Sequence, residues 1–282
     1  MGEVSATRQG KGGIELSSLD WLLLHHRVKL LDRQEIVRKL DIQPGDRVLD
    51  LGCGPGLWTQ LLADAVGPSG RIVGVDFDSY LLAHASRITK ESHPGHDISF
   101  LQMDFSSVGT LDESFDIVFF SNCFCYLPDP SSIVENMMQI ARPGGRIIGR
   151  NWDGEPFLLY PMDVKLLSLV QHQLVQATEY RTDGAFFDHY FGRKMPGLFR
   201  RQNFRHVTCD THVIERFGPA DTDLAAYIRT NGEWMGDKIQ DRIDKESLAE
   251  WYAHFDPDDP RCVYRSNEFY FCMIEMAVTG YV

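Results

Sequence analysis

A glycine-rich run follows the first buried segment of the chain and has the composition of a ligand-binding turn. Glycines recur in Gly52-Cys53-Gly54-Pro55-Gly56, directly after residues 48–51, which are apolar except for Asp50. Glycine adopts backbone angles that other residues resist, and it lets a ligand approach the main chain closely. The spacing is G-x-G-x-G, and Leu57 stands where the dinucleotide fingerprint G-x-G-x-x-G requires its last glycine. A glycine turn alone is weak evidence, because many such turns are purely structural.

Two acidic residues follow later apolar segments at positions that suit a nucleoside. Asp76 ends the second segment about 20 residues after the glycine run, where a carboxylate can accept hydrogen bonds from both ribose hydroxyls. Asp104 ends the third segment and can accept a hydrogen bond from the exocyclic amine of a purine. Asp76 could instead cap the next helix, but Asp78 or Ser79 can fill that position.

The elements that must position these residues alternate between strand and helix. Strands are expected at 47–51, 71–76, 98–103, 115–120 and 146–149, with helices between them at 57–66, 79–91 and 131–141. This alternation predicts a parallel sheet with right-handed crossovers, whose strand ends bring the three groups together. Around this core we expect helices at 17–40 (broken near its middle), 157–177, 188–201 and 221–254, and strands at 206–214 and 269–279. The interpretation is one α/β domain with helical additions.

Composition narrows the choice of partner. The 282 residues carry a formal net charge of −12, which disfavours nucleic acid as a partner because such binding relies on Lys and Arg. The cluster Arg200, Arg201 and Arg205 is better explained as a solvated helix end. Six cysteines show no paired C-x-x-C spacing, which favours reduced thiols. No targeting or membrane-spanning segment is visible, so we expect a cytoplasmic protein that is a monomer or a homodimer.

The first half of the chain carries a set of motifs in a recognisable order. They are VLDLGCGPG, GVDFD, FLQMDF, FDIVFFSNCFCYLPD and RPGGRIIG, over about residues 44 to 150. With them the chain resembles the class I methyltransferases that use S-adenosylmethionine (SAM), especially the small-molecule group that includes the ubiquinone and menaquinone biosynthesis type. The resemblance implies a Rossmann-like, seven-stranded, mostly parallel sheet with an antiparallel last strand and helices on both faces.

The same resemblance assigns binding roles to residues of this chain. It implies that Gly52, Cys53, Gly54 and Gly56 line the methionine part of SAM, and that Asp50 helps to place its ammonium group. Asp76 is expected to hold the ribose, and Phe77 to lie beside the adenine. Asp104 and Phe105 are expected at the edge and face of the adenine, and Ser121 and Asn122 to offer backbone carbonyls to the ammonium group.

Methyl transfer from SAM is an in-line displacement that needs alignment more than an activating group. The catalytic residues are therefore unknown from the sequence, and His26, His189 and Tyr190 are weak candidates for a base. Asn151 and Asp153 have too few acidic neighbours for magnesium, so no metal is expected. Two other functions remain open: a SAM-binding enzyme for cyclisation or decarboxylation, and a SAM-binding subunit without catalysis.

The acceptor is expected to be a small, partly apolar metabolite, methylated on O, N or C. Residues 1–40 are interpreted as a helical lid, and residues 41–282 as the methyltransferase domain with helical insertions at about 153–201 and 218–260. We expect the N-terminal helix and the 153–201 segment to line an aromatic acceptor pocket, because methyl transfer requires that water is excluded. Deletion of residues 1–40 is then expected to abolish turnover while leaving much of the SAM affinity.

Overall fold

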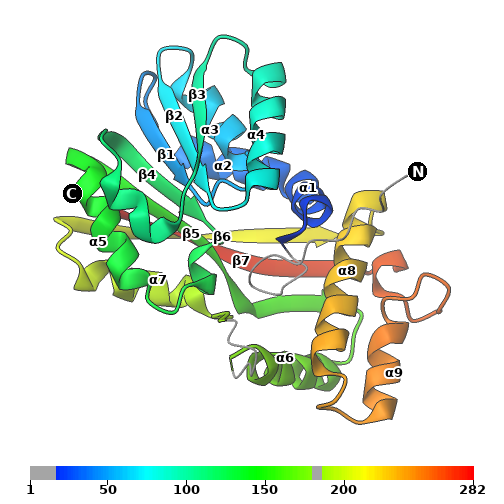
Figure 1. The fold of residues 1–282 in the computed structure, drawn as a ribbon. Coiled ribbons are helices and arrows are strands. Elements are labelled where there is room, and N and C mark those ends of the chain that lie inside the picture. Colours follow the sequence, from blue (N-terminus) through cyan, green and yellow to red (C-terminus); the bar gives the residue numbers. More distant parts are fainter. Residues whose placement is uncertain (1–16, 180–185) are drawn as a thin grey trace, which may run out of the picture. The chain divides into compact units, whose positions relative to one another are not determined.

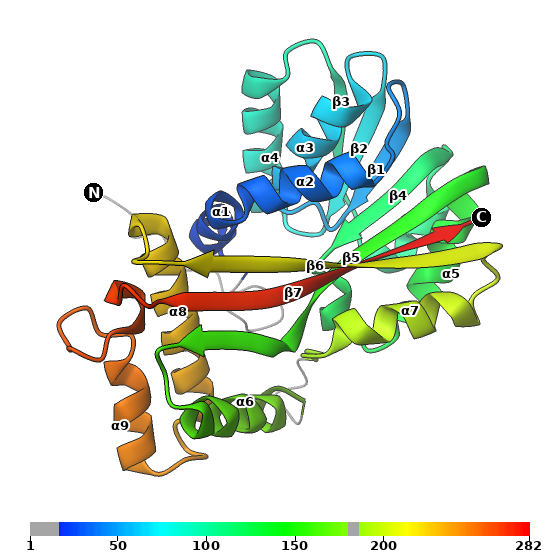
Figure 2. The same ribbon diagram turned by 180° about the vertical axis from the view of Figure 1, so that it is seen from behind.

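A computed structural model describes residues 17–179 and 186–282. Within these residues the strands form one seven-stranded sheet in the order β3-β2-β1-β4-β5-β7-β6 (Figure 1). Strands β1 to β5 pair in parallel, whereas the arrow of β7 runs opposite to those of its neighbours β5 and β6 (Figure 2). The strands are β1 (Arg47–Leu51), β2 (Arg71–Asp76), β3 (Asp97–Gln102), β4 (Phe115–Ser121), β5 (Ala141–Tyr160), β6 (His206–Phe217) and β7 (Tyr270–Tyr281).

Several helices begin directly after an aspartate that caps them. Asp78, Asp129, Asp221 and Asp244 each accept a backbone N–H in the first turn of the helix that follows. The α-helices are α1 (Leu19–Val28), α2 (Leu30–Lys39), α3 (Leu57–Val66), α4 (Ser79–Ser92), α5 (Pro130–Ile140), α6 (Val164–Glu179), α7 (Phe191–Arg201), α8 (Thr222–Ile239) and α9 (Lys245–Ala253). Short 3-10 turns are η2 (Phe105–Thr110), η3 (Phe124–Tyr126) and η4 (Val263–Arg265).

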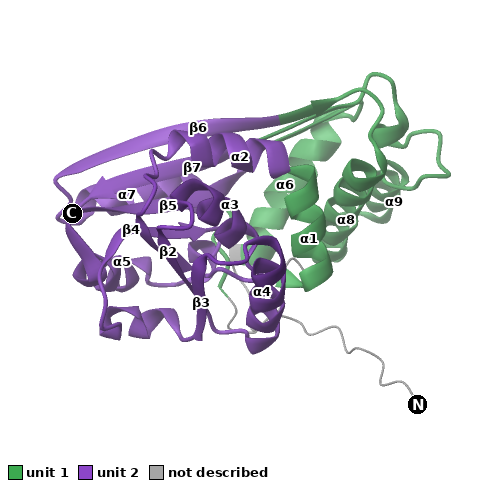
Figure 3. Ribbon diagram, turned by 90° about the horizontal axis from the view of Figure 1, so that it is seen from above, with its two compact units in different colours: residues 1–29, 155–189, 215–273 green, residues 30–154, 190–214, 274–282 purple. Residues whose placement is uncertain are grey.

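The chain divides into two compact units, shown in separate colours in Figure 3. Unit 1 comprises residues 1–29, 155–189 and 215–273, and unit 2 comprises residues 30–154, 190–214 and 274–282. Unit 2 therefore holds β1 to β4, the first part of β5 and every residue of the glycine run. Unit 1 holds α1, α6, α8 and α9.

Helices cover both faces of the sheet in unit 2 (Figures 1 and 2). On one face α2 and α3 bury a cluster that includes Ile36, Trp58, Leu62 and Phe119 against the strands. On the other face Phe120 of β4 stacks on Phe124 with ring centroids 3.7 Å apart. Because β1 and β4 are buried on both faces, they are apolar almost throughout.

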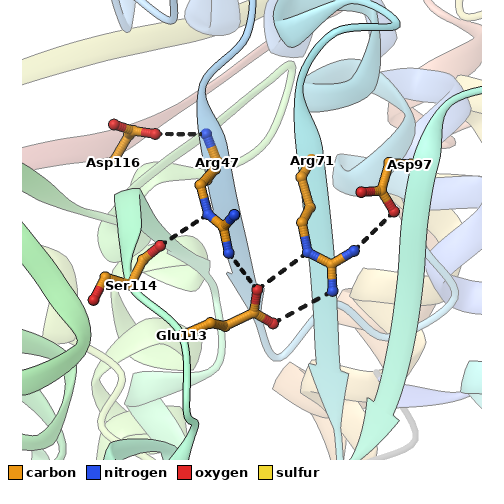
Figure 4. A network of polar contacts seen from close by, with 6 residues as sticks. All are labelled: Arg47, Arg71, Asp97, Glu113, Ser114 and Asp116. Carbon is orange, nitrogen blue, oxygen red and sulfur yellow. Dashed lines mark hydrogen bonds and ion pairs between the residues drawn. The ribbon is translucent and has the colours of Figure 1, made fainter.

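A polar network ties together the amino ends of the first strands (Figure 4). The Glu113 carboxylate accepts hydrogen bonds from Arg47 Nη2 at 2.6 Å and from Arg71 Nε at 3.1 Å. Arg71 Nη1 also donates to Asp97 at 2.8 Å, and the Arg47 backbone N–H donates to Asp116 at 2.7 Å. These contacts fix the end of the sheet opposite to the glycine run, since Arg47, Arg71 and Asp97 are the first residues of their strands.

Most elements lie where the sequence places them, and the corrections concern the fifth strand with the helix after it and the helix expected over 221–254. The helix expected over 17–40 is broken near its middle, as predicted, because α1 and α2 meet at Lys29. The fifth strand, expected to end at residue 149, continues to Tyr160, and the helix expected from Phe157 begins only at Val164. Phe157 and Leu159 are buried while Leu158 and Tyr160 are exposed, which is the alternation of a strand. The expected helix over 221–254 is divided into α8 and α9.

Candidate functional site

The glycine turn after β1 has a backbone that only glycine accepts easily. Gly52, Gly54 and Gly56 have φ values of 73°, 51° and 78°, in the left-handed region. A Cβ on Gly52 would also lie 2.9 Å from Cys123 Sγ and 3.1 Å from the Phe105 ring. The turn after β1, the residue after Asp104 and the loop after β4 therefore meet at Gly52. This is the convergence of strand ends that the sequence predicts for a ligand site.

Asp76, the last residue of β2, holds the glycine turn in place. Its Oδ2 accepts the Gly54 backbone N–H at 2.9 Å, and its Oδ1 accepts the Asp78 N–H at 2.9 Å. Burial raises the pKa of the Asp76 carboxyl, although both backbone hydrogen bonds favour its ionised form. Each carboxylate oxygen has two acceptor sites, so the same group retains capacity for two hydroxyl donors. Asp78, one of the two residues predicted to cap this helix, caps α4 by accepting the Tyr80 backbone N–H, so Asp76 is not needed as the cap.

Asp50 lies one strand away and is fully buried beneath the turn. Its Oδ2 accepts a 2.6 Å hydrogen bond from Thr59 Oγ1 on α3. Burial raises the pKa of Asp50 to about 7, with a smaller contribution from the charge of Asp76, while the Thr59 hydrogen bond acts in the opposite direction. A nearby cation would favour the ionised carboxylate and lower this pKa. Asp50 therefore has the environment of an acid that ionises when a positive ligand group arrives.

The residues expected around the adenine lie at the ends of β2 and β3. Phe77 is 39% exposed, and its carbonyl accepts Gln102 Nε2 at 3.0 Å. Asp104 is exposed and caps η2, because its Oδ1 accepts the Ser106 N–H at 2.9 Å and the Ser106 hydroxyl at 2.6 Å. Phe105 reaches the glycine turn, as its proximity to Gly52 shows. Asp104 thus has a structural role that the sequence analysis did not assign to it.

The loop after β4 is fixed by its own side chains. Asn122 has a φ of 54°, which is unusual for a residue with a Cβ. Its side-chain Oδ1 accepts the Trp152 N–H at 3.0 Å, and its backbone N–H donates to the Arg150 carbonyl at 2.9 Å. Ser121 Oγ accepts a 2.7 Å hydrogen bond from Arg150 Nη1. Both side chains therefore hold the loop. The contact with the ammonium group that is predicted for Ser121 and Asn122 uses their backbone carbonyls.

The cysteines near the turn are small apolar residues in their chemistry. Burial raises the pKa of the Cys53 thiol and of the Cys123 thiol well above the ordinary value, and the carboxyl groups of Asp50 and Asp76 add to both effects. Both sulfurs accordingly stay protonated and are poor nucleophiles.

The weak candidates for a base are distributed over both units. His26 lies on α1, in unit 1. His189 also belongs to unit 1, and its ring packs edge-on against Phe187. Tyr190 belongs to unit 2, and its ring lies 4.7 Å from the Arg193 guanidinium carbon.

Asn151 and Asp153 follow Arg150 on β5. The sequence analysis considered them as metal ligands and expected no metal there. The Asp153 carboxylate accepts the Arg193 backbone N–H at 3.0 Å and two of its guanidinium donors at 2.8 and 2.6 Å. In residues 17–179 and 186–282 no three His, Cys, Asp or Glu side chains are grouped as metal ligands. Asp153 therefore orients the start of α7.

The sequence analysis missed two polar residues that shape the site. Thr59 holds Asp50, and Arg150 holds Ser121. A hydroxyl one turn into the helix after a glycine loop was a usable signal for Thr59. Nothing in the local sequence identifies Arg150, whose carboxylate partner Glu275 is 125 positions further along the chain.

Together the residues provide a left-handed glycine turn, a ribose-type acceptor in Asp76 and a buried acid in Asp50. This donor and acceptor set suits a nucleoside that carries a positively charged amino-acid chain. In the described part of the chain no helix is long and apolar enough to cross a membrane.

Comparison with known proteins finds similarity over the same stretch. Residues 48–145 match the family model described as a methyltransferase domain. The demethylmenaquinone methyltransferase of Anoxybacillus flavithermus is 31% identical over 116 residues, which are 41% of this chain and 48% of that protein. The demethylmenaquinone methyltransferase of Lactobacillus johnsonii is 31% identical over 147 residues, 48% of this chain and 60% of that protein. The chain spans about half the length of these curated relatives.

Solved structures share the fold over most of the chain. A cyclopropane-fatty-acyl-phospholipid synthase-like protein from Lactobacillus casei superposes with a TM-score of 0.60, covering 94% of each chain at 16% identity. At this identity the likeness shows the fold alone. The family match and the sheet order confirm the resemblance and the Rossmann-like α/β fold predicted from the sequence.

Proposed function

We propose that this chain, in which residues 48–145 match the family model described as a methyltransferase domain, transfers a methyl group from SAM to a small molecule. The observation that carries the proposal is the Gly52 turn, whose backbone is pinned by the Asp76 carboxylate and lies above the buried Asp50. A side chain at Gly52 would fill this space, so the turn provides a cradle for main-chain contact with a ligand.

The residues present suit SAM. Asp76 would accept the ribose hydroxyls, with Phe77 beside the adenine and Phe105 against its face. Asp50 would supply negative charge beneath the ammonium group, and the backbone carbonyls of Ser121 and Asn122 would accept its protons. When bound, SAM supplies an electrophilic methyl group that passes to the acceptor by in-line displacement and leaves S-adenosylhomocysteine (SAH). The chain contributes alignment and the exclusion of water.

The acceptor site is a proposal from the sequence alone. We propose that a partly apolar metabolite binds aromatic residues of the N-terminal segment and of residues 153–201, of which residues 1–16 and 180–185 lie outside the described residues. A general base is needed only if the acceptor must lose a proton, and His26, His189 and Tyr190 stay candidates for it. The acidic composition supports a protein without a nucleic-acid partner, and the six free thiols support a cytoplasmic location. We propose that the protein is a monomer or a homodimer.

The deletion that tests the N-terminal segment should be shorter than residues 1–40. Residues 1–40 include α2, and Ile36, Val37 and Leu40 are buried in the core of unit 2. Removing them would damage the fold together with any lid. A deletion that ends at residue 28 keeps α2 intact, and we expect it to abolish turnover while SAM affinity is largely kept. Full turnover by that truncated chain would contradict a role of the N-terminal segment in catalysis.

Cofactor binding is tested by calorimetry with SAM and SAH. The Asp76→Ala variant loses a charge-assisted pair of contacts to the ribose, and we expect a loss of about 2 kcal/mol for both ligands. Asp78→Asn is the matched control, because it removes a neighbouring charge but keeps an oxygen to cap α4. Equal affinity of wild type and Asp76→Ala would remove Asp76 from the site.

Turnover is tested by mass spectrometry of a metabolite mixture incubated with SAM. Methyl transfer adds one methyl group to the acceptor and releases SAH, whereas cyclisation leaves the mass of a substrate unchanged. SAM binding without any product would favour a subunit without catalysis.

A further inference from the structure

A buried ion pair joins β5 to β7 in unit 2. The Arg150 guanidinium contacts the Glu275 carboxylate, and both side chains are completely buried. Two charges lose their hydration on burial, and a well-packed apolar pair of similar volume is often as stable as such an ion pair. Stability is therefore a weak explanation for charged residues at these positions.

The other contacts of Arg150 lead to the proposed cofactor site from two sides. Its Nη1 donates to Ser121 Oγ at 2.7 Å, at the end of β4. Its guanidinium carbon lies 4.7 Å from the centroid of the Trp58 ring. Trp58 is the second residue of α3 and follows Gly56 by two positions. A single guanidinium thus touches the loop after β4 and the helix that begins at the glycine turn.

The backbone of Arg150 reinforces this arrangement. Its carbonyl accepts the Asn122 N–H at 2.9 Å, and two residues further Trp152 donates its N–H to the Asn122 side chain at 3.0 Å. Asn122 has a left-handed backbone at this point. Such a conformation persists only where the surroundings hold it, and here β5 supplies both contacts.

We propose that Arg150, kept charged and oriented by Glu275, is a positioning residue for the amino-acid part of the cofactor. It fixes the Ser121 and Asn122 carbonyls on one side of the proposed cofactor site and the start of α3 on the other side. This inference rests on the proposed function, which assigns those carbonyls to the ammonium group. Arg150 itself touches no ligand, because it is buried behind the residues that do.

The test compares two ligands that differ only at the end in question. SAH carries the amino-acid chain, whereas 5′-methylthioadenosine has the same nucleoside and sulfur without it. Loss of a positioning residue for the carbonyls should weaken SAH and leave 5′-methylthioadenosine unchanged. A residue that merely stabilises the fold would change both affinities together or neither.

The first variant is the pair Arg150→Met with Glu275→Leu, which removes both charges and keeps the volume apolar. Removing one partner alone would leave an uncompensated buried charge, so the paired change is the milder perturbation. We expect its SAH dissociation constant to rise about tenfold, with 5′-methylthioadenosine within twofold of wild type.

The second variant, Ser121→Ala, keeps the backbone carbonyl and removes only the hydroxyl that Arg150 holds. We expect a smaller rise of about threefold to fivefold for SAH alone. Ser132→Ala, at an exposed position of α5, is the matched control and should behave as wild type. If the paired variant does not fold, Ser121→Ala decides the question.

Two results would overturn the inference. One is wild-type affinity for SAH in the paired variant or, where that fails to fold, in Ser121→Ala. The other is an equal loss for SAH and 5′-methylthioadenosine. Failure of the cofactor assignment would look different, since the wild-type chain would then bind neither ligand. Failure of methyl transfer alone would leave both ligands bound and give no methylated product.

Discussion

We expect Asp50, proposed to supply negative charge to the ammonium group of SAM, to make SAM binding dependent on pH. Burial raises its pKa to about 7, so the neutral acid dominates below that pH. The ammonium group of the ligand favours the ionised carboxylate and lowers the pKa in the complex. A proton is therefore released on binding, and affinity increases as pH rises from about 5 toward 7.

The size of the effect follows from the ionised fraction of the free site. With a pKa of about 7, roughly one site in thirty is ionised at pH 5.5 and one in two at pH 7.0. If only the ionised site binds, the apparent dissociation constant changes by the same ratio, about 15-fold. This corresponds to about 1.6 kcal/mol. Staying at or below pH 7.0 keeps the α-amino group of SAM protonated.

Calorimetry in two buffers with different ionisation enthalpies measures the released proton directly. We expect close to one proton at pH 5.5 and about half a proton at pH 7.0 for wild type. Asp50→Asn keeps an oxygen that can accept from Thr59 but cannot ionise, so its SAM affinity should be lower and nearly flat over this range. An equally steep dependence in Asp50→Asn would refute the assignment to Asp50.

Three further predictions concern the stability of the fold. The folded chain keeps a proton on Asp50 that the unfolded chain releases near pH 4, so this stabilisation is present below pH 4 and is lost as pH rises through 7. Thermal melts without added ligand should therefore show Asp50→Asn gaining stability relative to wild type between pH 5 and pH 8. Gly52→Ala combines a positive φ with overlap at Cys123, and chemical denaturation should show a loss of about 2 kcal/mol or more. Glu113→Gln weakens the contacts to Arg47 and Arg71 by about 1 kcal/mol, and the difference should shrink at 1 M salt.

The parallel core was predictable because local patterns determine it. Each of its strands is a short apolar run, and each is followed by a residue that turns or caps the chain, such as Gly52 or Asp78. The end of β5 was not predictable in the same way. Phe157 to Tyr160 are apolar or aromatic throughout, so the sequence gives no period, and only burial separates Phe157 from Leu158.

Some residues of the candidate site were predictable from the sequence and others were not. The glycine turn and Asp76 follow from residue type and spacing, which can be read directly from the sequence. Asp104 has the right position, yet its contacts with Ser106 show a capping role that competes with the predicted one. Arg150 and Glu275 escaped notice because a buried ion pair is defined by two residues that are distant in the chain.

The surroundings of Trp58 have an optical consequence. Its indole is buried, and the guanidinium carbons of Arg33 and Arg150 lie 5.0 and 4.7 Å from its ring centroid. The emission energy of indole depends on the electric field across the ring, and two fixed cations impose a strong one. Trp58 also follows Gly56 by two residues, so its fluorescence should change when a ligand binds at the glycine turn. Among the five tryptophans of the chain, the difference between wild type and Trp58→Phe isolates this built-in reporter.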